Sequence, residues 1–278
     1  MKKVLVVITG FLGDALLSQP IANRLKEESQ ADIVDFIVGF PQTKLLLEQN
    51  PYIDNVIISD LYGSSPNYLP IAHLYDEVRI TSPYKGQYPL TIHHQLSTGV
   101  KSPQLDYKVY TVPEYDTLVA EQLKNLPALP IIGIGQVWKT FDFRCYDSTA
   151  LTNLLLEKYN VLGIGHPPGV SHIDIATMEE SEKTFAYQAS LCKHLDLMIG
   201  SEGGLTNLAA GVGCKVLYTT DFTYTLSGPE GTHYRHPNPI EVLGPRAYFP
   251  DSNHKSLDYS IHPDRYVEKI LEEIDNIL

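Results

Sequence analysis

The sequence has few cysteines and no long apolar run, and each absence excludes a class of protein. Its cysteines, Cys145, Cys192 and Cys214, are too few and too scattered for a disulfide framework or a paired-cysteine metal site, so we expect free thiols. The first apolar run, at residues 4–8, is too short for the hydrophobic region of a signal peptide or for a membrane span. We therefore expect a cytoplasmic protein.

Positive charge is also scarce. The chain has 21 Lys and Arg against 33 Asp and Glu, which gives a net charge of −12, and no block of like charges occurs. This balance argues against nucleic acid as a partner, because binding to the phosphate backbone needs a basic surface. At most we expect peripheral association with a membrane.

What the sequence does contain is typical of a globular protein with two cores. At 278 residues it exceeds the length that one hydrophobic core usually serves, so two domains are expected. Its residues are 43% hydrophobic and 19% charged, and no repeat or low-complexity tract interrupts them.

Short apolar runs rich in β-branched residues alternate with segments of helical spacing. This alternation predicts the α/β class, with parallel sheets covered by helices. A stretch rich in Tyr and Pro separates two such series, so we expect two Rossmann-like domains facing across a cleft, at residues 1–126 and 127–278. The expected strands are at 3–8, 33–38, 55–58, 131–135, 160–165, 195–199 and 215–218, and the expected helices at 14–28, 149–158, 181–194 and 204–212.

The last segment, "HPDRYVEKILEEIDNIL", predicts an amphipathic helix that starts behind Pro263. In two-domain α/β proteins such a terminal helix can cross back onto the first domain. Its apolar stripe consists of Val267, Ile270, Leu271, Ile274, Ile277 and Leu278.

A glycine turn in "VVITGFLGDALL" joins the first strand to the first helix. Free amides and the positive end of the helix dipole suit such a turn to an anion or a closely approaching substrate. A third glycine is missing, and no Tyr has a Lys four residues later, which argues against both the dinucleotide fingerprint and a short-chain dehydrogenase. Asp14 is either the cap of this helix or a general base. Pro20 indicates that the helix kinks there or starts near Ser18.

Four segments of the chain resemble glycosyltransferase family 9, the heptosyltransferase-like enzymes with the GT-B fold. They are "TGFLGDALLSQPIANRLK", "LLEQNPYIDNVI", "HHQLSTGV" and "LCKHLDLMIGSEGGLTNLAAGVGCKVLY", and together they span most of the chain. The resemblance implies an acceptor-binding first domain, whose loop contains Gly10, Phe11 and Gly13, and a second domain that binds a nucleotide-sugar donor. It also implies that Asp14 is the catalytic base.

The last of these segments is similar to the donor-site signature of the family, Asn-Asp-Ser-Gly-Pro-Met-His-Leu. The resemblance implies that the acid lies beside the donor sugar and that the glycine turn and helix start meet the diphosphate. The residues themselves suit this role, because glycines let the backbone approach phosphate and a carboxylate can accept hydrogen bonds from sugar hydroxyls. Alternatively, the acid caps a helix of small residues. The positions are Glu202 in place of Asp, Gly203, Gly204, Leu205, Thr206, and Asn207 in place of His.

A departing diphosphate also needs positive charge unless amides suffice. The loop "QVWKTFDFRCYD" offers Lys139, next to Thr140, and Arg144, although neither stands at the spacing of the family and a solvated loop charge is the alternative. His166 follows another expected strand, where it contacts the base or ribose or merely fills a turn.

The remaining histidines invite a metal interpretation, which we reject. His93, His94, His233 and His236 have no Asp or Glu at ligand spacing to complete a zinc site. Tyrosines within residues 62–88 are candidates for lining an acceptor cleft, because aromatic faces stack on sugars.

The resemblance therefore implies an inverting glycosyltransferase that moves a sugar from a nucleotide-diphosphate sugar to a glycan or glycolipid hydroxyl. The resemblance places such an enzyme in cell-envelope polysaccharide biosynthesis. The donor is a co-substrate, and we expect no metal and no other cofactor. A non-hydrolysing nucleotide-sugar 2-epimerase and a catalytically inactive nucleotide-sugar- or glycan-binding protein are the alternatives.

Overall fold

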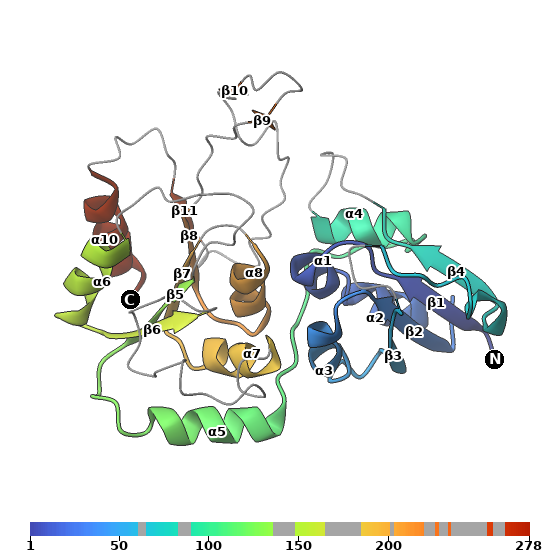
Figure 1. Cartoon of the computed structure of the whole chain (residues 1–278), viewed down its shortest axis with the longest axis horizontal. Coiled ribbons are helices and arrows are strands. Elements are labelled where there is room, and N and C mark those ends of the chain that lie inside the picture. The colour runs from blue at the N-terminus through green and yellow to red at the C-terminus, as the bar shows by residue number, and fades with distance from the viewer. Residues whose placement is uncertain are drawn as a thin grey trace.

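The structure, a computed structural model, contains two parallel β-sheets with helices packed on their faces (Figure 1). This confirms the predicted α/β class. The structure describes residues 1–60, 65–82, 90–135, 148–164, 185–200, 203–219, 226–227, 233–234, 255–257 and 265–278.

The first sheet has four parallel strands in the order β3-β2-β1-β4. β1 and β2 are almost wholly buried, and strands covered on both faces read as continuous apolar runs, which is why both were predictable. β4 was missed, because "EVRI" is a half-buried edge strand that alternates charged and apolar residues. The bounds are β1 (Lys3–Val7), β2 (Ile33–Val38), β3 (Asn55–Ile58) and β4 (Glu77–Ile80).

Four helices and two 3-10 turns accompany this sheet. The helical spacing at residues 14–28 forms two helices, and the break lies at the place for which a kink or a start near Ser18 was predicted. Pro20, which has no N–H to donate, begins the second helix as its first residue. The helices are α1 (Leu12–Leu17), α2 (Pro20–Glu27), α3 (Lys44–Leu47) and α4 (Leu90–Ser97), and the turns are η1 (Pro41–Thr43) and η2 (Ala72–Leu74).

The second sheet has five parallel strands in the order β11-β8-β7-β5-β6. One face packs on α7 and α8 and the other on α6 and α10, so each face has its own buried cluster. A short antiparallel pair, β9 with β10, completes the described strands. The bounds are β5 (Ile131–Gly135), β6 (Asn160–Ile164), β7 (Leu197–Gly200), β8 (Val216–Thr219), β9 (Leu226–Ser227), β10 (His233–Tyr234), β11 (Lys255–Leu257), α6 (Ser148–Leu156), α7 (Phe185–Lys193), α8 (Gly204–Gly211) and α10 (Tyr266–Ile277).

The C-terminal helix α10 covers the second sheet. Its residues Ile270 and Ile274 are fully buried in a cluster with Ile132 of β5 and Leu151 of α6. Figure 1 shows α10 beside α6, on the side of the second sheet that faces away from the first domain. The crossing back onto the first domain that we considered for this helix is therefore wrong, because its apolar stripe is buried against the strands that precede it.

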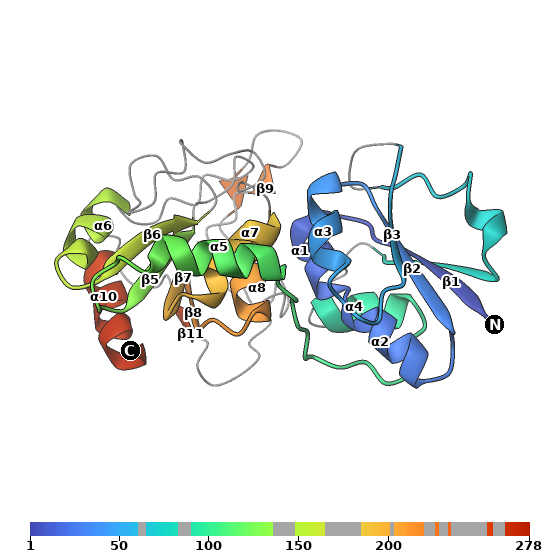
Figure 2. The same cartoon turned by 90° about the horizontal axis from the view of Figure 1, so that it is seen from below.

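Helix α5 (Pro113–Leu123) runs along α7 of the second domain, as Figure 2 shows. The Tyr115 ring meets the Tyr187 ring edge-on, with centroids 6.0 Å apart. The Asp116 carboxylate lies 2.6 Å from the Lys193 ammonium, and this ion pair, with hydrogen bonds from neighbouring hydroxyls, lowers the pKa of Asp116 despite its burial. The boundary at residues 126 and 127 stays a prediction, although α5 precedes it and packs with the helices beyond it.

The helices and the cysteines can be compared with what the composition predicted. Within the described ranges, no helix combines the length and the apolarity that crossing a bilayer requires. Cys192 and Cys214 are buried free thiols, as expected, whereas Cys145 lies outside the described residues.

Candidate active site

The candidate site lies where α1 of the first domain meets α8 of the second. Leu12 and Leu16 share one buried cluster with Leu205 and Leu208, so the two helices are in direct contact. Figure 1 shows them side by side between the two sheets. Each helix begins just beyond the carboxyl end of a strand, β1 for α1 and β7 for α8. Ligands of open α/β sheets bind at this edge.

Gly10 makes the first turn possible. Its φ of +105° is a conformation that residues with a Cβ rarely adopt. A Cβ atom on Gly10 would also stand 2.2 Å from Oδ2 of Asp14. Glycine at this position therefore serves both the backbone of the turn and the space that the Asp14 carboxylate occupies.

Asp14 is held at both of its carboxylate oxygens. Oδ2 accepts a hydrogen bond of 2.8 Å from the amide of Phe11, and Oδ1 lies 3.3 Å from Nε2 of His94. The first contact is a capping interaction, in which the third helical residue reaches back to the residue before the helix. The side chain is nevertheless 27% exposed, so the capping contact leaves part of it open to solvent.

His94 is the residue of this site that sequence reasoning missed. It lies on α4, is 1% exposed, and approaches Asp14 from a position 80 residues later in the chain. The pair His93 and His94 was considered only as metal ligands, and no local signal linked either histidine to Asp14. Among the described residues, no cluster of three or more His, Cys, Asp or Glu side chains could hold a metal ion, and the expectation of no metal stays a prediction.

Gly203 and Gly204, at the turn before α8, differ in how closely neighbouring residues approach them. No atom of the described residues lies within 4 Å of a Cβ atom placed on Gly203, whereas one on Gly204 would stand 3.0 Å from Cδ2 of Leu12. The hydroxyl of Thr206 accepts a hydrogen bond from the Gly203 amide and donates one to the Gly203 carbonyl, so this side chain holds the turn. The side chain of Leu205 is buried in the core.

Asn207 joins the two helix starts. Its Nδ2 atom would be 3.5 Å from a Cβ atom on Gly13, and its carbonyl accepts a hydrogen bond of 2.6 Å from the Tyr107 hydroxyl. The residue is 2% exposed, and its Oδ1 atom has no hydrogen-bond partner among the described residues. Asn207 therefore lies at the contact between the two domains.

No protein-family model and no curated protein matches this chain. Solved structures do. ADP-heptose lipopolysaccharide heptosyltransferase II of E. coli matches with a TM-score of 0.65 at 13% identity, over 99% of both chains. A family 9 glycosyltransferase of Veillonella parvula also matches with a TM-score of 0.65 at 13% identity, over 100% of this chain and 90% of that one. Heptosyltransferase WaaC of E. coli with ADP matches with a TM-score of 0.59 at 13% identity, over 99% of this chain and 100% of that one.

The chain has the heptosyltransferase fold of glycosyltransferase family 9. This confirms, at the level of the fold, the resemblance carried by the four sequence segments. At 13% identity the match does not transfer the activity of those proteins to this chain, and the cleft expected between the domains stays a prediction.

In this heptosyltransferase fold, the switch point of the second sheet lies between β5 and β7, where strand order reverses. Their final residues, Gly135 and Gly200, approach closely, because a Cβ atom on Gly200 would stand 3.6 Å from the Cα of Gly135. The segments that follow β5, β6 and β7 contain further candidate residues, which lie outside the described part of the chain: Lys139, Thr140, Arg144, His166 and Glu202.

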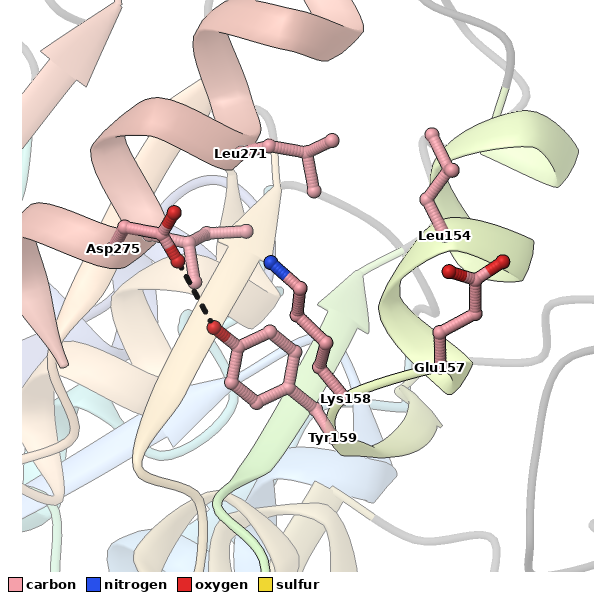
Figure 3. A pocket seen from close by; sticks show the side chains of 7 residues that line it. Leu154, Glu157, Lys158, Tyr159, Leu271 and Asp275 are labelled. Carbon is pink, nitrogen blue, oxygen red and sulfur yellow. Dashed lines mark hydrogen bonds between the residues drawn. The ribbon is translucent and has the colours of Figure 1, made fainter.

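A separate hollow lies between α6 and α10 (Figure 3). These helices cover the face of the second sheet opposite to that on which α8 packs. The volume of the hollow is about 110 Å³, and the Tyr159 hydroxyl donates a hydrogen bond of 3.2 Å to Asp275 there. Burial, together with this carboxylate, raises the pKa of Tyr159. The hollow lies among helices that cover the sheet, away from the helix starts that adjoin Asp14, and we assign it no role.

Proposed function

We propose that this protein is a glycosyltransferase that moves a sugar from a nucleotide-diphosphate sugar to an acceptor hydroxyl. The observation that carries the proposal is the contact between the two glycine turns. A Cβ atom on Gly13 would stand 3.7 Å from the Cα of Gly204, and Gly13 directly precedes Asp14, whose side chain is partly exposed. Transfer of a sugar from a donor to an acceptor requires a base for the acceptor hydroxyl and a site for the phosphates of the donor. Asp14 and the start of α8 supply these two components from two different domains.

The donor is assigned to the second domain. The N-terminus of α8 presents the positive end of a helix dipole, which favours a diphosphate. Two proteins of similar fold support this choice: the heptosyltransferase TibC was solved with ADP-D-beta-D-heptose and WaaC with ADP. Glu202, directly before Gly203, accepts hydrogen bonds from the sugar, and Lys139 or Arg144 adds positive charge near the phosphates.

The acceptor is assigned to the first domain. Phe11 begins the loop beside Asp14, its side chain is 64% exposed, and its ring lies 5.1 Å from the ring of Phe40. This pair, of an exposed Phe11 and a half-buried Phe40, offers an apolar surface for the face of an acceptor sugar. The acceptor is a glycan or glycolipid, and cell-envelope polysaccharide synthesis is the proposed setting.

The proposed reaction is a single displacement with inversion. The acceptor hydroxyl gives its proton to the Asp14 carboxylate while its oxygen bonds to the anomeric carbon of the donor. The bond between that carbon and the phosphate oxygen breaks, and the nucleoside diphosphate leaves, stabilised by the α8 amides and a cation from the 136–147 segment. No metal ion is required in this scheme.

A thermal-shift screen against nucleotide-sugars tests the donor assignment. A ligand at 100 times its dissociation constant should add about 2.7 kcal/mol to the free energy of unfolding. A hit is then incubated alone and with glycan acceptors, and the products are separated by mass spectrometry. Conversion of the donor without acceptor would identify an epimerase, and binding with no conversion would identify a binding protein. Absence of any stabilising nucleotide-sugar would contradict the proposal.

A further inference from the structure

His94 contacts Asp14 in a way that a cap alone does not require. The Phe11 amide already completes the capping contact at Oδ2, and His94 adds a second contact at Oδ1. We infer that His94 is a positioning residue, a neutral imidazole whose Nε2–H donates to Oδ1 and fixes the plane of the Asp14 carboxylate. This inference rests on the proposed function in one respect, that Asp14 is the base.

The two nitrogens of His94 differ in their surroundings, and this difference decides where the proton lies. Nε2 faces a carboxylate oxygen at 3.3 Å, where a lone pair would be repelled and an N–H is attracted. Nδ1 is buried and has no partner among the described residues. A proton on Nδ1 would thus be a buried donor without an acceptor, in the other neutral tautomer and in the imidazolium alike. The neutral Nε2–H tautomer is the only form without an orphan donor.

The ring is also held so that it cannot turn away. The Thr91 hydroxyl donates a hydrogen bond of 2.9 Å to the carbonyl of Leu17, which ties the first turn of α4 to the end of α1. The Thr98 hydroxyl donates one of 3.0 Å to the His94 carbonyl. The ring is almost wholly buried and α1 contacts α4, so the packing of these two helices sets the distance between Asp14 and His94.

This arrangement gives His94 a defined and limited role. A carboxylate oxygen has two lone pairs, so after the contacts from Phe11 and His94 each oxygen keeps one for the acceptor hydroxyl. Because Nε2 already carries a proton, His94 does not take the proton that Asp14 receives. That proton leaves from Asp14 itself, whose side chain is partly open to solvent. His94 contributes orientation, and a small misorientation of a base is costly.

Two substitutions separate the hydrogen bond from the volume of the ring. In His94→Gln the amide nitrogen reaches the place of Nε2, whereas in His94→Asn it reaches only the place of Nδ1. We expect His94→Gln to keep kcat within roughly threefold and His94→Asn to lower it roughly 10- to 100-fold, with the donor KM within about twofold. The control is His73→Gln, at an exposed residue of η2. Equal loss in the Gln and Asn variants, at equal melting temperatures, would overturn the assignment.

A double-mutant cycle asks whether His94 acts through Asp14. In the Asp14→Asn background, His94→Asn should cause no further loss of transfer, because the group that it positions is gone. A further loss of tenfold or more would mean that His94 touches the substrates by another route, which would overturn its role as a positioning residue.

The tautomer can be measured without any turnover. Long-range ¹H–¹⁵N correlation spectra of the full-length wild-type protein distinguish a protonated Nε2 from a protonated Nδ1 at near-neutral pH. We expect the Nε2–H signature for His94, assigned by its loss in His94→Gln. An Nδ1–H or imidazolium signature would overturn the inference. If no sugar transfer is found while the Nε2–H signature is present, the proposed function fails and the geometry of the pair stands.

Discussion

Gly10→Ala is expected to weaken both the fold and the site through a single methyl group. At a φ of +105° a residue with a Cβ is strained by about 1–3 kcal/mol. The new Cβ atom would also stand 2.2 Å from Asp14 Oδ2, so the carboxylate must leave the Phe11 amide. Loss of such a cap costs about 1 kcal/mol more. The sum is a loss of roughly 2–4 kcal/mol in the free energy of unfolding.

The chain offers a matched control in Gly213. Its φ is +92°, yet within the described part of the chain no atom lies within 4 Å of a Cβ atom placed there, so Gly213→Ala has the backbone strain without the clash. Urea unfolding should show Gly10→Ala to be less stable than Gly213→Ala by about 1 kcal/mol, the value of the cap. Transfer should fall roughly 100-fold in Gly10→Ala only, since only there is the base displaced.

Equal stability of the two variants, together with full transfer activity in Gly10→Ala, would refute this reasoning. That result would mean that the Asp14 carboxylate does not occupy the space beside Gly10. Activity is read as kcat at saturating donor and acceptor, so that the stability difference does not enter the comparison.

The remaining predictions concern the base, the donor, metals and the thiols. Asp14→Asn should keep the fold and donor affinity and lower transfer roughly 100-fold or more; transfer at the parental rate would leave Asp14 a cap only. Glu202→Ala should weaken binding of the intact nucleotide-sugar more than of the bare nucleotide in calorimetry, and equal losses would remove its assignment to the sugar. EDTA should leave the rate unchanged, and recovery of lost activity on adding magnesium or manganese would contradict the scheme. Burial raises the pKa of the Cys214 thiol to about 12 and also raises that of Cys192, so both stay protonated at about pH 8. Alkylation at that pH, followed by mass spectrometry, should modify them only after unfolding.

Much of the fold could be predicted because burial leaves a local pattern in the sequence. β1, β2 and β5 are covered on both faces, and this makes them continuous apolar runs that are visible without any structure. The turn at Gly10 was visible for a similar reason, since a glycine between a strand and a helix predicts a sharp change of backbone direction. β4 escaped because its alternation of charged and apolar residues is weak over four residues.

Other features depended on contacts between distant parts of the chain. The apolar stripe on α10 predicted that an apolar surface covers it. Only the structure shows that this surface is the second sheet, on which Ile270 and Ile274 pack. The packing of α5 on α7 depends in the same way on residues about 70 positions apart, such as Tyr115 and Tyr187. An amphipathic pattern predicts that one face of a helix is buried, but it does not identify the surface that covers this face.

The candidate site, too, has one part that the sequence predicted and one part that depends on contacts between distant residues. The sequence by itself determined that Asp14 follows a glycine turn at the end of a strand, because turn, strand and helix start are neighbours in the chain. Only the tertiary structure decided that His94 faces it. β4 pairs with β1 in the first sheet, so the helix that follows β4 is brought beside the helix that follows β1. The order of strands in a sheet is a property of the whole domain, and no local spacing of residues encodes it.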